Sequence, residues 1–189
     1  SISLGVWLIA SPLLALAQEY RPPKRGTPGR REGAGTRGPC IRSSRFLMPL
    51  LPQDGFSITV SKSPTLFWSV PATAAKTAEF KLVGNNDQEL YRQTIELSGQ
   101  AGVVALALPD RVTEMFLKPN QDFRWQFSLI CDPNQPSKNP FVEGVIQRHL
   151  PEQALVDRVN RATNTPELAT IYAGAGVWQE AVSTLATQR

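Results

Sequence analysis

The chain has 189 residues and a mass of 20.8 kDa, which is enough for one domain with a small appendage. Hydrophobic residues make up 41% and charged residues 19%, a composition that allows a packed core and excludes wholesale disorder. With one His and two Cys, a zinc site built from four Cys and His ligands is excluded. The net charge of +4 is modest, and its distribution along the chain is more informative than its size.

Residues 1–17, SISLGVWLIASPLLALA, are uncharged and end in the small-residue pattern Ala15-Leu16-Ala17. An apolar run of this length before such a pattern is typical of a secretory signal peptide, and it is short for a membrane span. We therefore expect cleavage after Ala17, export to the periplasm or the extracellular space, and no transmembrane anchor once the signal is removed. A buried N-terminal helix is the alternative, although Pro12 would interrupt it.

Residues 18–45 form a basic tail rich in Pro, Gly and Arg. It carries eight Lys and Arg side chains against two Glu, a net charge of +6, so the rest of the chain is slightly acidic. With few apolar residues, the tail cannot offset its ordering entropy by burial. We expect four of its arginines to contact an anionic envelope polymer or an envelope protein. These are Arg25, Arg30, Arg31 and Arg37. A solvated linker without a partner is the alternative, and nucleic acid is disfavoured because no aromatic residues are interleaved with the arginines.

The two cysteines are Cys40 and Cys131. An exported protein enters an oxidising compartment, where two cysteines are more often paired than free. We therefore predict a disulfide between them, which would tie the end of the tail to the end of an apolar strand and contribute about 4–5 kcal/mol. Two unrelated buried thiols are the alternative.

From Phe46 onward the hydrophobic pattern has a period of two. Seven short apolar segments follow, separated by turns rich in Pro, Gly, Asn and Asp. Their ranges are 56–60, 66–70, 80–82, 91–97, 103–108, 123–131 and 141–149. This pattern predicts a mainly β fold, an antiparallel immunoglobulin-like β-sandwich over residues 46–150. Alternation places Trp125 and Phe127 on one buried face, where core packing is favoured over a platform for a sugar.

Residues 151–189 change to helical spacing, which first appears at Ala154, Leu155, Val159 and Ala162. A C-terminal α-helical pair is then predicted, with Thr165 as its N-cap and Pro166 at the first helical position. The stretch from Leu168 to Leu185 resembles a single tetratricopeptide unit. Its signature positions are Leu168, Ala169, Tyr172, Gly176, Trp178, Ala181 and Leu185. One unit does not form a solenoid, so we expect the pair to pack on the sandwich or on a repeat of another protein. Tyr172 and Trp178 are the predicted packing or docking residues.

Candidate catalytic groups are sparse. His149 has no Ser or Cys nucleophile in a recognisable motif, and Asp132 and Glu143 could pair as carboxylates for glycoside hydrolysis. A chain with 16 acidic residues offers many such pairs, so the signal is weak. No phosphate-binding loop of the GxxxxGK type is present. The sequence thus predicts no catalytic residue, no metal ligand and no cofactor.

Three stretches carry a family resemblance. They are the stretch from Pro23-Lys24-Arg25 through the REGAGTRG run to Cys40, FRWQFSLICDP at 123–133 and FVEGVIQR at 141–148. Together they resemble the cyanobacterial "domain of unknown function 928" family over residues 20–188, with a departure at Val145, where an aromatic residue is expected. The resemblance implies an exported protein that works beside repeat-containing envelope or signalling proteins, and it supplies no established active site.

These observations favour a non-catalytic binding or interaction module of the cell envelope. A hydrolase acting on envelope polymers is the alternative, and it would require an acid, a base or a nucleophile clustered in one cleft. A purely structural subunit is a third option.

Overall fold

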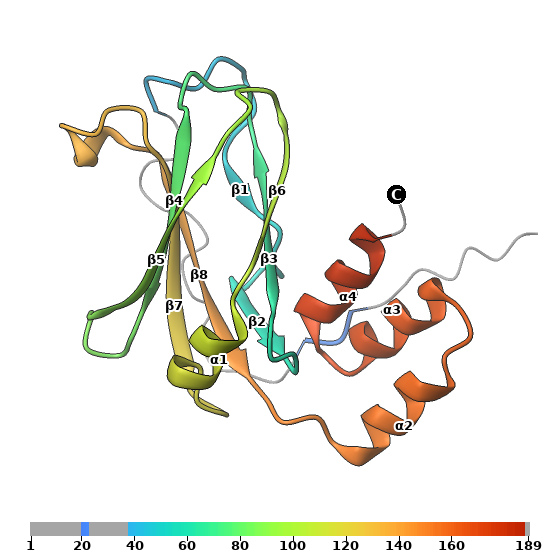
Figure 1. Cartoon of the computed structure of the whole chain (residues 1–189). Helices are drawn as coiled ribbons and strands as arrows, with labels where there is room; N and C mark the ends of the chain where they lie inside the picture. The colour runs from blue at the N-terminus through green and yellow to red at the C-terminus, as the bar shows by residue number, and fades with distance from the viewer. Residues whose placement is uncertain (1–19, 23–37, 188–189) are drawn as a thin grey trace, which may run out of the picture.

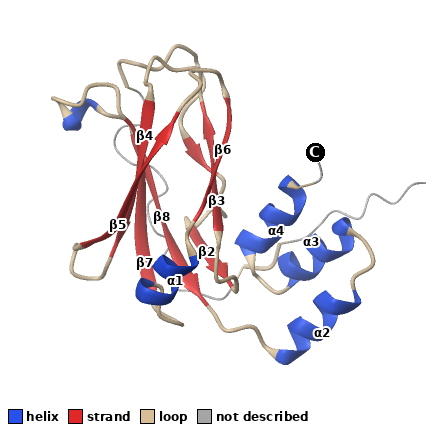
Figure 2. Cartoon of the chain, viewed as in Figure 1, coloured by secondary structure: helices blue, strands red, loops and turns tan. Residues whose placement is uncertain are grey.

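The computed structural model describes residues 20–22 and 38–187. The described part contains two β-sheets and a group of α-helices that lies beside them (Figure 2). The predicted signal peptide, residues 1–17, and the four predicted anion-binding arginines lie outside the described residues.

The larger sheet has five strands in the order β2-β8-β7-β4-β5. Their bounds are β2 Phe56–Thr59, β4 Thr77–Val83, β5 Glu89–Glu96, β7 Asp122–Leu129 and β8 Phe141–Arg148. Three of the four pairings are antiparallel, whereas β2 runs parallel to β8. The prediction of a wholly antiparallel sandwich is therefore wrong at this edge. The period of two fixes which face a side chain takes, but it does not fix the partner or direction of a strand.

The smaller sheet has three antiparallel strands in the order β1-β3-β6. Their bounds are β1 Met48–Pro49, β3 Thr65–Val70 and β6 Gly102–Ala107. The two sheets share one core, in which Trp68 of β3 stacks on Phe127 of β7 with ring centroids 4.2 Å apart. Trp125 meets the same Trp68 ring edge-on. The prediction that Trp125 and Phe127 share a buried face is confirmed, while an immunoglobulin-like topology stays a prediction.

Two short helices interrupt the strands. They are α1, Asp110–Phe116, and the 3-10 helix η1, Pro136–Lys138. Neither was predicted, because each is too short for a helical period to show in the sequence. The helix α1 buries Val112 and Thr113 at the end of the sandwich (Figure 1).

Among the described residues, three helices follow the last strand: the helical spacing at 154–162 forms the first, and the predicted pair forms the other two. They are α2 Gln153–Arg161, α3 Thr165–Gly174 and α4 Trp178–Ala186. The N-cap of α3 is Asn164, whose side chain accepts a hydrogen bond from the Glu167 amide at 2.9 Å, so the cap lies one residue before Thr165, the predicted N-cap. Buried Ala169 and Ala181 let α3 and α4 approach closely. The turn between them uses Gly176 with φ of +73°, a conformation that suits glycine.

The helical pair α3–α4 packs on the sandwich of its own chain (Figure 1). The Trp178 indole Nε1–H donates to the Leu50 carbonyl at 2.8 Å, and the Gln179 amide donates to the Ser57 hydroxyl at 2.9 Å. Val177 joins a small apolar cluster with residues of β2. These contacts place α4 along the outer edge of β2.

Candidate functional site

The predicted disulfide is confirmed. Cys40 and Cys131 are bonded, with their Cα atoms 5.4 Å apart. Cys40 is buried, and its carbonyl accepts a hydrogen bond from the Ala74 amide. The bond therefore joins the segment before the first strand to the end of β7.

The predicted packing residues Tyr172 and Trp178 both make contacts within the chain. Tyr172 is half-buried against the apolar cluster on β2, and burial, with a contribution from Glu180, raises the pKa of its hydroxyl. The Trp178 ring meets Tyr20 edge-on at 4.8 Å, and the Arg21 amide donates to the Ala173 carbonyl. The helical pair thus holds the short segment that follows the predicted cleavage site. Docking of these residues on another protein stays a prediction.

The three residues that a hydrolase would need are not brought together. Asp132 lies in the loop after β7, at the Phe141 end of β8, whereas His149 follows the opposite end of that strand. At about 3.3 Å per residue, Phe141 and His149 are roughly 26 Å apart. Glu143 lies between them, opposite Gln126 of β7. Among the described residues, no group of His, Cys, Asp and Glu is arranged to hold a metal ion.

The five-stranded sheet carries a cavity of about 480 Å³ on its outer face. Strands β4, β5 and β7 form its floor, and the loop 131–140 forms one wall. Its lining residues are Thr77, Glu79, Lys81, Arg92, Thr94, Gln126, Ser128, Ile130, Pro133, Pro136, Asn139 and Phe141. We call it the outer-face cavity. The strand residues that line it alternate with the buried core residues of the same strands.

The charges of the outer-face cavity largely neutralise one another. Glu79 forms ion pairs with Lys81 at 2.9 Å and Arg92 at 2.6 Å. Arg92 also binds Glu89 through two nitrogens, and these hydrogen bonds lower the pKa of the Glu89 carboxyl and raise that of the guanidinium. The groups left to bind a ligand are hydroxyls and amides, beside the apolar surfaces of Phe141 and the wall prolines. This mixture suits a hydroxyl-rich ligand.

Hydrogen bonds to Asn139 and the disulfide fix the loop that forms the wall of the outer-face cavity. Asn139 is 9% exposed, and its side-chain oxygen accepts hydrogen bonds from the amides of Cys131 at 2.9 Å and Asp132 at 3.0 Å. The disulfide anchors the loop at Cys131, and the Leu129 amide donates to the Pro140 carbonyl. The loop therefore stands in a fixed position beside the sheet. This site was not predicted from the sequence. Its one sequence signal is the pair Gln126 and Ser128, polar residues that alternate with the buried residues of β7 and line the cavity.

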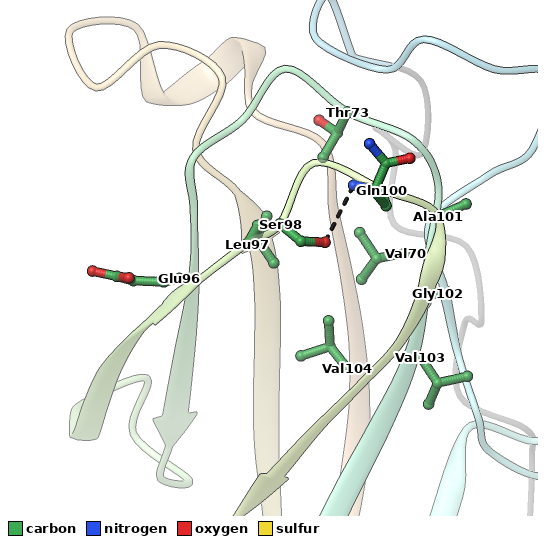
Figure 3. Close-up of a pocket in the computed structure, with 10 residues that line it drawn as sticks. All are labelled: Val70, Thr73, Glu96, Leu97, Ser98, Gln100, Ala101, Gly102, Val103 and Val104. Carbon is green, nitrogen blue, oxygen red and sulfur yellow. Dashed lines mark hydrogen bonds between the residues drawn. The ribbon is translucent and has the colours of Figure 1, made fainter.

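A second cavity, of about 250 Å³, opens between β5 and β6 (Figure 3). We call it the flank cavity. Val70, Leu97 and Val104 give it an apolar interior. Ser98 and Gln100 lie in the turn between the two strands, where the backbone N–H of Gln100 donates a hydrogen bond to the Ser98 hydroxyl (Figure 3).

The fold and the two cavities define a disulfide-bonded, two-sheet β protein with C-terminal helices. The chain matches the family called Domain of Unknown Function (DUF928) over residues 32–189 and belongs to that family. No curated protein and no solved structure matches it. No helix within the described ranges is long and apolar enough to cross a membrane.

Proposed function

We propose that the protein is an exported, non-catalytic binding module of the cell envelope and that its ligand is an anionic polysaccharide. The observation that carries the proposal is the outer-face cavity, which combines side-chain hydroxyls and amides with apolar surface and self-compensated charges. Sugar hydroxyls can exchange hydrogen bonds with such groups, while a sugar ring rests on apolar side chains.

The basic tail would supply the long-range part of the interaction. Its charge of +6 attracts a polyanion over distances that a neutral cavity cannot cover, and this attraction weakens with salt. The disulfide supports export, because such bonds persist in oxidising compartments.

A hydrolase acting on envelope polymers remains the alternative function. It is disfavoured by the separation of Asp132 from His149 along β8. Release of new reducing ends from a polysaccharide would favour it over binding alone.

Calorimetric titration of the disulfide-bonded chain tests the proposal, with hyaluronate as the anionic probe and dextran as the neutral one. We expect hyaluronate to bind more tightly at low salt and dextran to bind weakly and independently of salt. Replacing the four arginines, Arg25, Arg30, Arg31 and Arg37, with Gln should remove the salt dependence. Hyaluronate affinity that is unchanged in this variant would refute the role of the tail.

The cavity itself is tested by Gln126→Leu, which keeps the side-chain size and removes the amide. Loss of one hydrogen bond, worth about 0.5–1.5 kcal/mol, should weaken binding roughly 2- to 12-fold at every salt concentration. The matched control is Gln100→Leu, which lies outside the outer-face cavity. Equal affinities of both variants and the wild type would contradict the cavity as the binding site.

A further inference from the structure

Each sheet has two edge strands, and three of these four edges carry a feature that blocks the addition of another strand. β1 is two residues long and contains Pro49. β2 is covered by α4, because the Val60 amide and the Thr59 hydroxyl donate to the Glu180 carboxylate. β5 exposes charged side chains and has a register shift against β4.

The remaining edge, β6, has none of these features. Its six residues include no charge and no proline, and its register with β3 is regular. In the described part of the chain, β3 is its paired neighbour and the other side has none. In an antiparallel sheet, successive residues of a strand direct their backbone N–H and C=O groups to opposite sides. The Leu50 amide donates to the Phe67 carbonyl, so the backbone groups of Phe67 face β1. Those of Leu66 and Trp68 therefore face β6, where they pair with Leu106 and Val104. By the same alternation, Val103, Ala105 and Ala107 direct their N–H and C=O groups to the free edge.

The flank cavity lies beside this edge. Figure 3 shows Val104 and Val103 on opposite sides of the β6 ribbon, with Val104 toward the space between β5 and β6. A Cβ atom built on Gly102 would meet nothing within 4 Å, so the space next to this glycine is open. The cavity volume of about 250 Å³ is below the range of about 300–1,000 Å³ that is usual for small-molecule sites. It suits a single apolar side chain.

We propose that β6 is a strand-addition site for an extended segment of a partner polypeptide with alternating apolar side chains. The partner backbone pairs with Val103, Ala105 and Ala107, and one inward side chain of the partner enters the flank cavity beside Gly102. The paired stretch of the partner is uncharged, because β6 carries no charge and the Glu96 side chain, although it lines the flank cavity, extends away from the other lining residues (Figure 3). This surface is separate from the outer-face cavity and does not depend on its function.

A second copy of β6 fits this surface less well than a detached segment. The inward side chains of β6 include Val104, which packs against the core of its own sandwich, and Leu106, which is 6% exposed. Neither is available to fill the flank cavity of another copy. The chain's own tail, residues 18–45, lacks alternating apolar residues and does not match the proposed occupant.

The test is selection of a random heptapeptide library on the immobilised, disulfide-bonded chain, followed by hydrogen exchange with the enriched peptide bound. We expect enriched peptides to carry apolar residues at every second position and no charge in the paired stretch. We also expect exchange of the Val103, Ala105 and Ala107 amides to slow at least tenfold on binding. No enrichment over a blank support, or unchanged exchange at these amides, would overturn the proposal.

Two variants locate the binding. Ala105→Pro removes an outward N–H and leaves the β3 ladder intact, whereas Ala105→Ser keeps that N–H and serves as the matched control. Gly102→Leu fills the flank cavity from the protein's own side and leaves the edge unchanged. We expect at least tenfold weaker peptide binding by Ala105→Pro and Gly102→Leu, and unchanged binding by Ala105→Ser.

Equal binding by all variants would overturn the proposal. A wild-type dimer in sedimentation that Ala105→Pro dissociates would identify a second copy as the occupant and would overturn it as well. The Gly102→Leu variant keeps the test decisive if Ala105→Pro fails to fold.

Discussion

Gly144 of β8 lies where the strand passes against the Trp125 ring. A Cβ atom at this position would come within 2.5 Å of both Trp125 Cζ2 and Leu51 Cδ1, distances that force the core to shift. We therefore expect Gly144→Ala to lower the free energy of unfolding by about 1–3 kcal/mol through overpacking. Urea unfolding measures this change. Gly102→Ala, which meets open space, is the control and should leave the stability within about 0.5 kcal/mol. Equal stabilities of the two variants would contradict the account of Gly144.

The Glu180 side chain lies at the interface between α4 and β2. Burial raises the pKa of its carboxyl above 4.5, and the hydrogen bonds from Thr59 and Val60 oppose this shift only in part. A group with a raised pKa in the folded state contributes stability at low pH that is lost as the pH rises through the raised pKa. The difference in the free energy of unfolding between the wild type and Glu180→Gln should therefore shift against the wild type as the pH rises from acidic to neutral. Urea unfolding of both proteins across this range measures the difference, and a pH-independent difference would show that the carboxyl titrates normally.

The disulfide links two segments that are 91 residues apart in the sequence. Removing it releases the constraint on the unfolded chain, and loop-closure entropy predicts a loss of about 4–5 kcal/mol. The variant with Cys40→Ser and Cys131→Ser should show this loss in urea unfolding. A cooperative thermal transition of both the wild type and the double variant serves as the check that both proteins start folded. A loss below about 1 kcal/mol would mean that the bond restrains a segment already held by other contacts.

The sequence predicts the elements better than it predicts their partners. The alternation at 123–131 predicts the buried face of β7 correctly, because burial alone sets that pattern. The parallel pairing of β2 with β8 has no local signal, since it depends on contacts between residues 88 apart, such as the Ser57 hydroxyl with the Val145 carbonyl. The same holds for the outer-face cavity, where β4, β5, β7 and the loop 131–140 meet only in the folded chain.

At the scale of the whole molecule, the first residues of the described chain are held by the last helices. The Tyr20 side chain lies against Trp178, and burial, with a smaller contribution from Asp54, raises the pKa of its hydroxyl to about 12. The predicted cleavage site after Ala17 is three residues earlier.

Intact mass of the exported protein tests the predicted processing. We expect a chain that begins at Gln18 and gains two hydrogens on reduction of the Cys40–Cys131 bond. A chain that retains residues 1–17 in the exported fraction would contradict the predicted signal peptide.

The most direct test of the central claim is an amide NMR titration of the disulfide-bonded protein with hyaluronate, in which the spectrum of the polymer is followed at the same time. Binding without catalysis predicts saturable shifts at Thr94, Gln126 and Ser128 and an unchanged polymer. Shifts that avoid these three residues, or signals of new reducing ends, would contradict it.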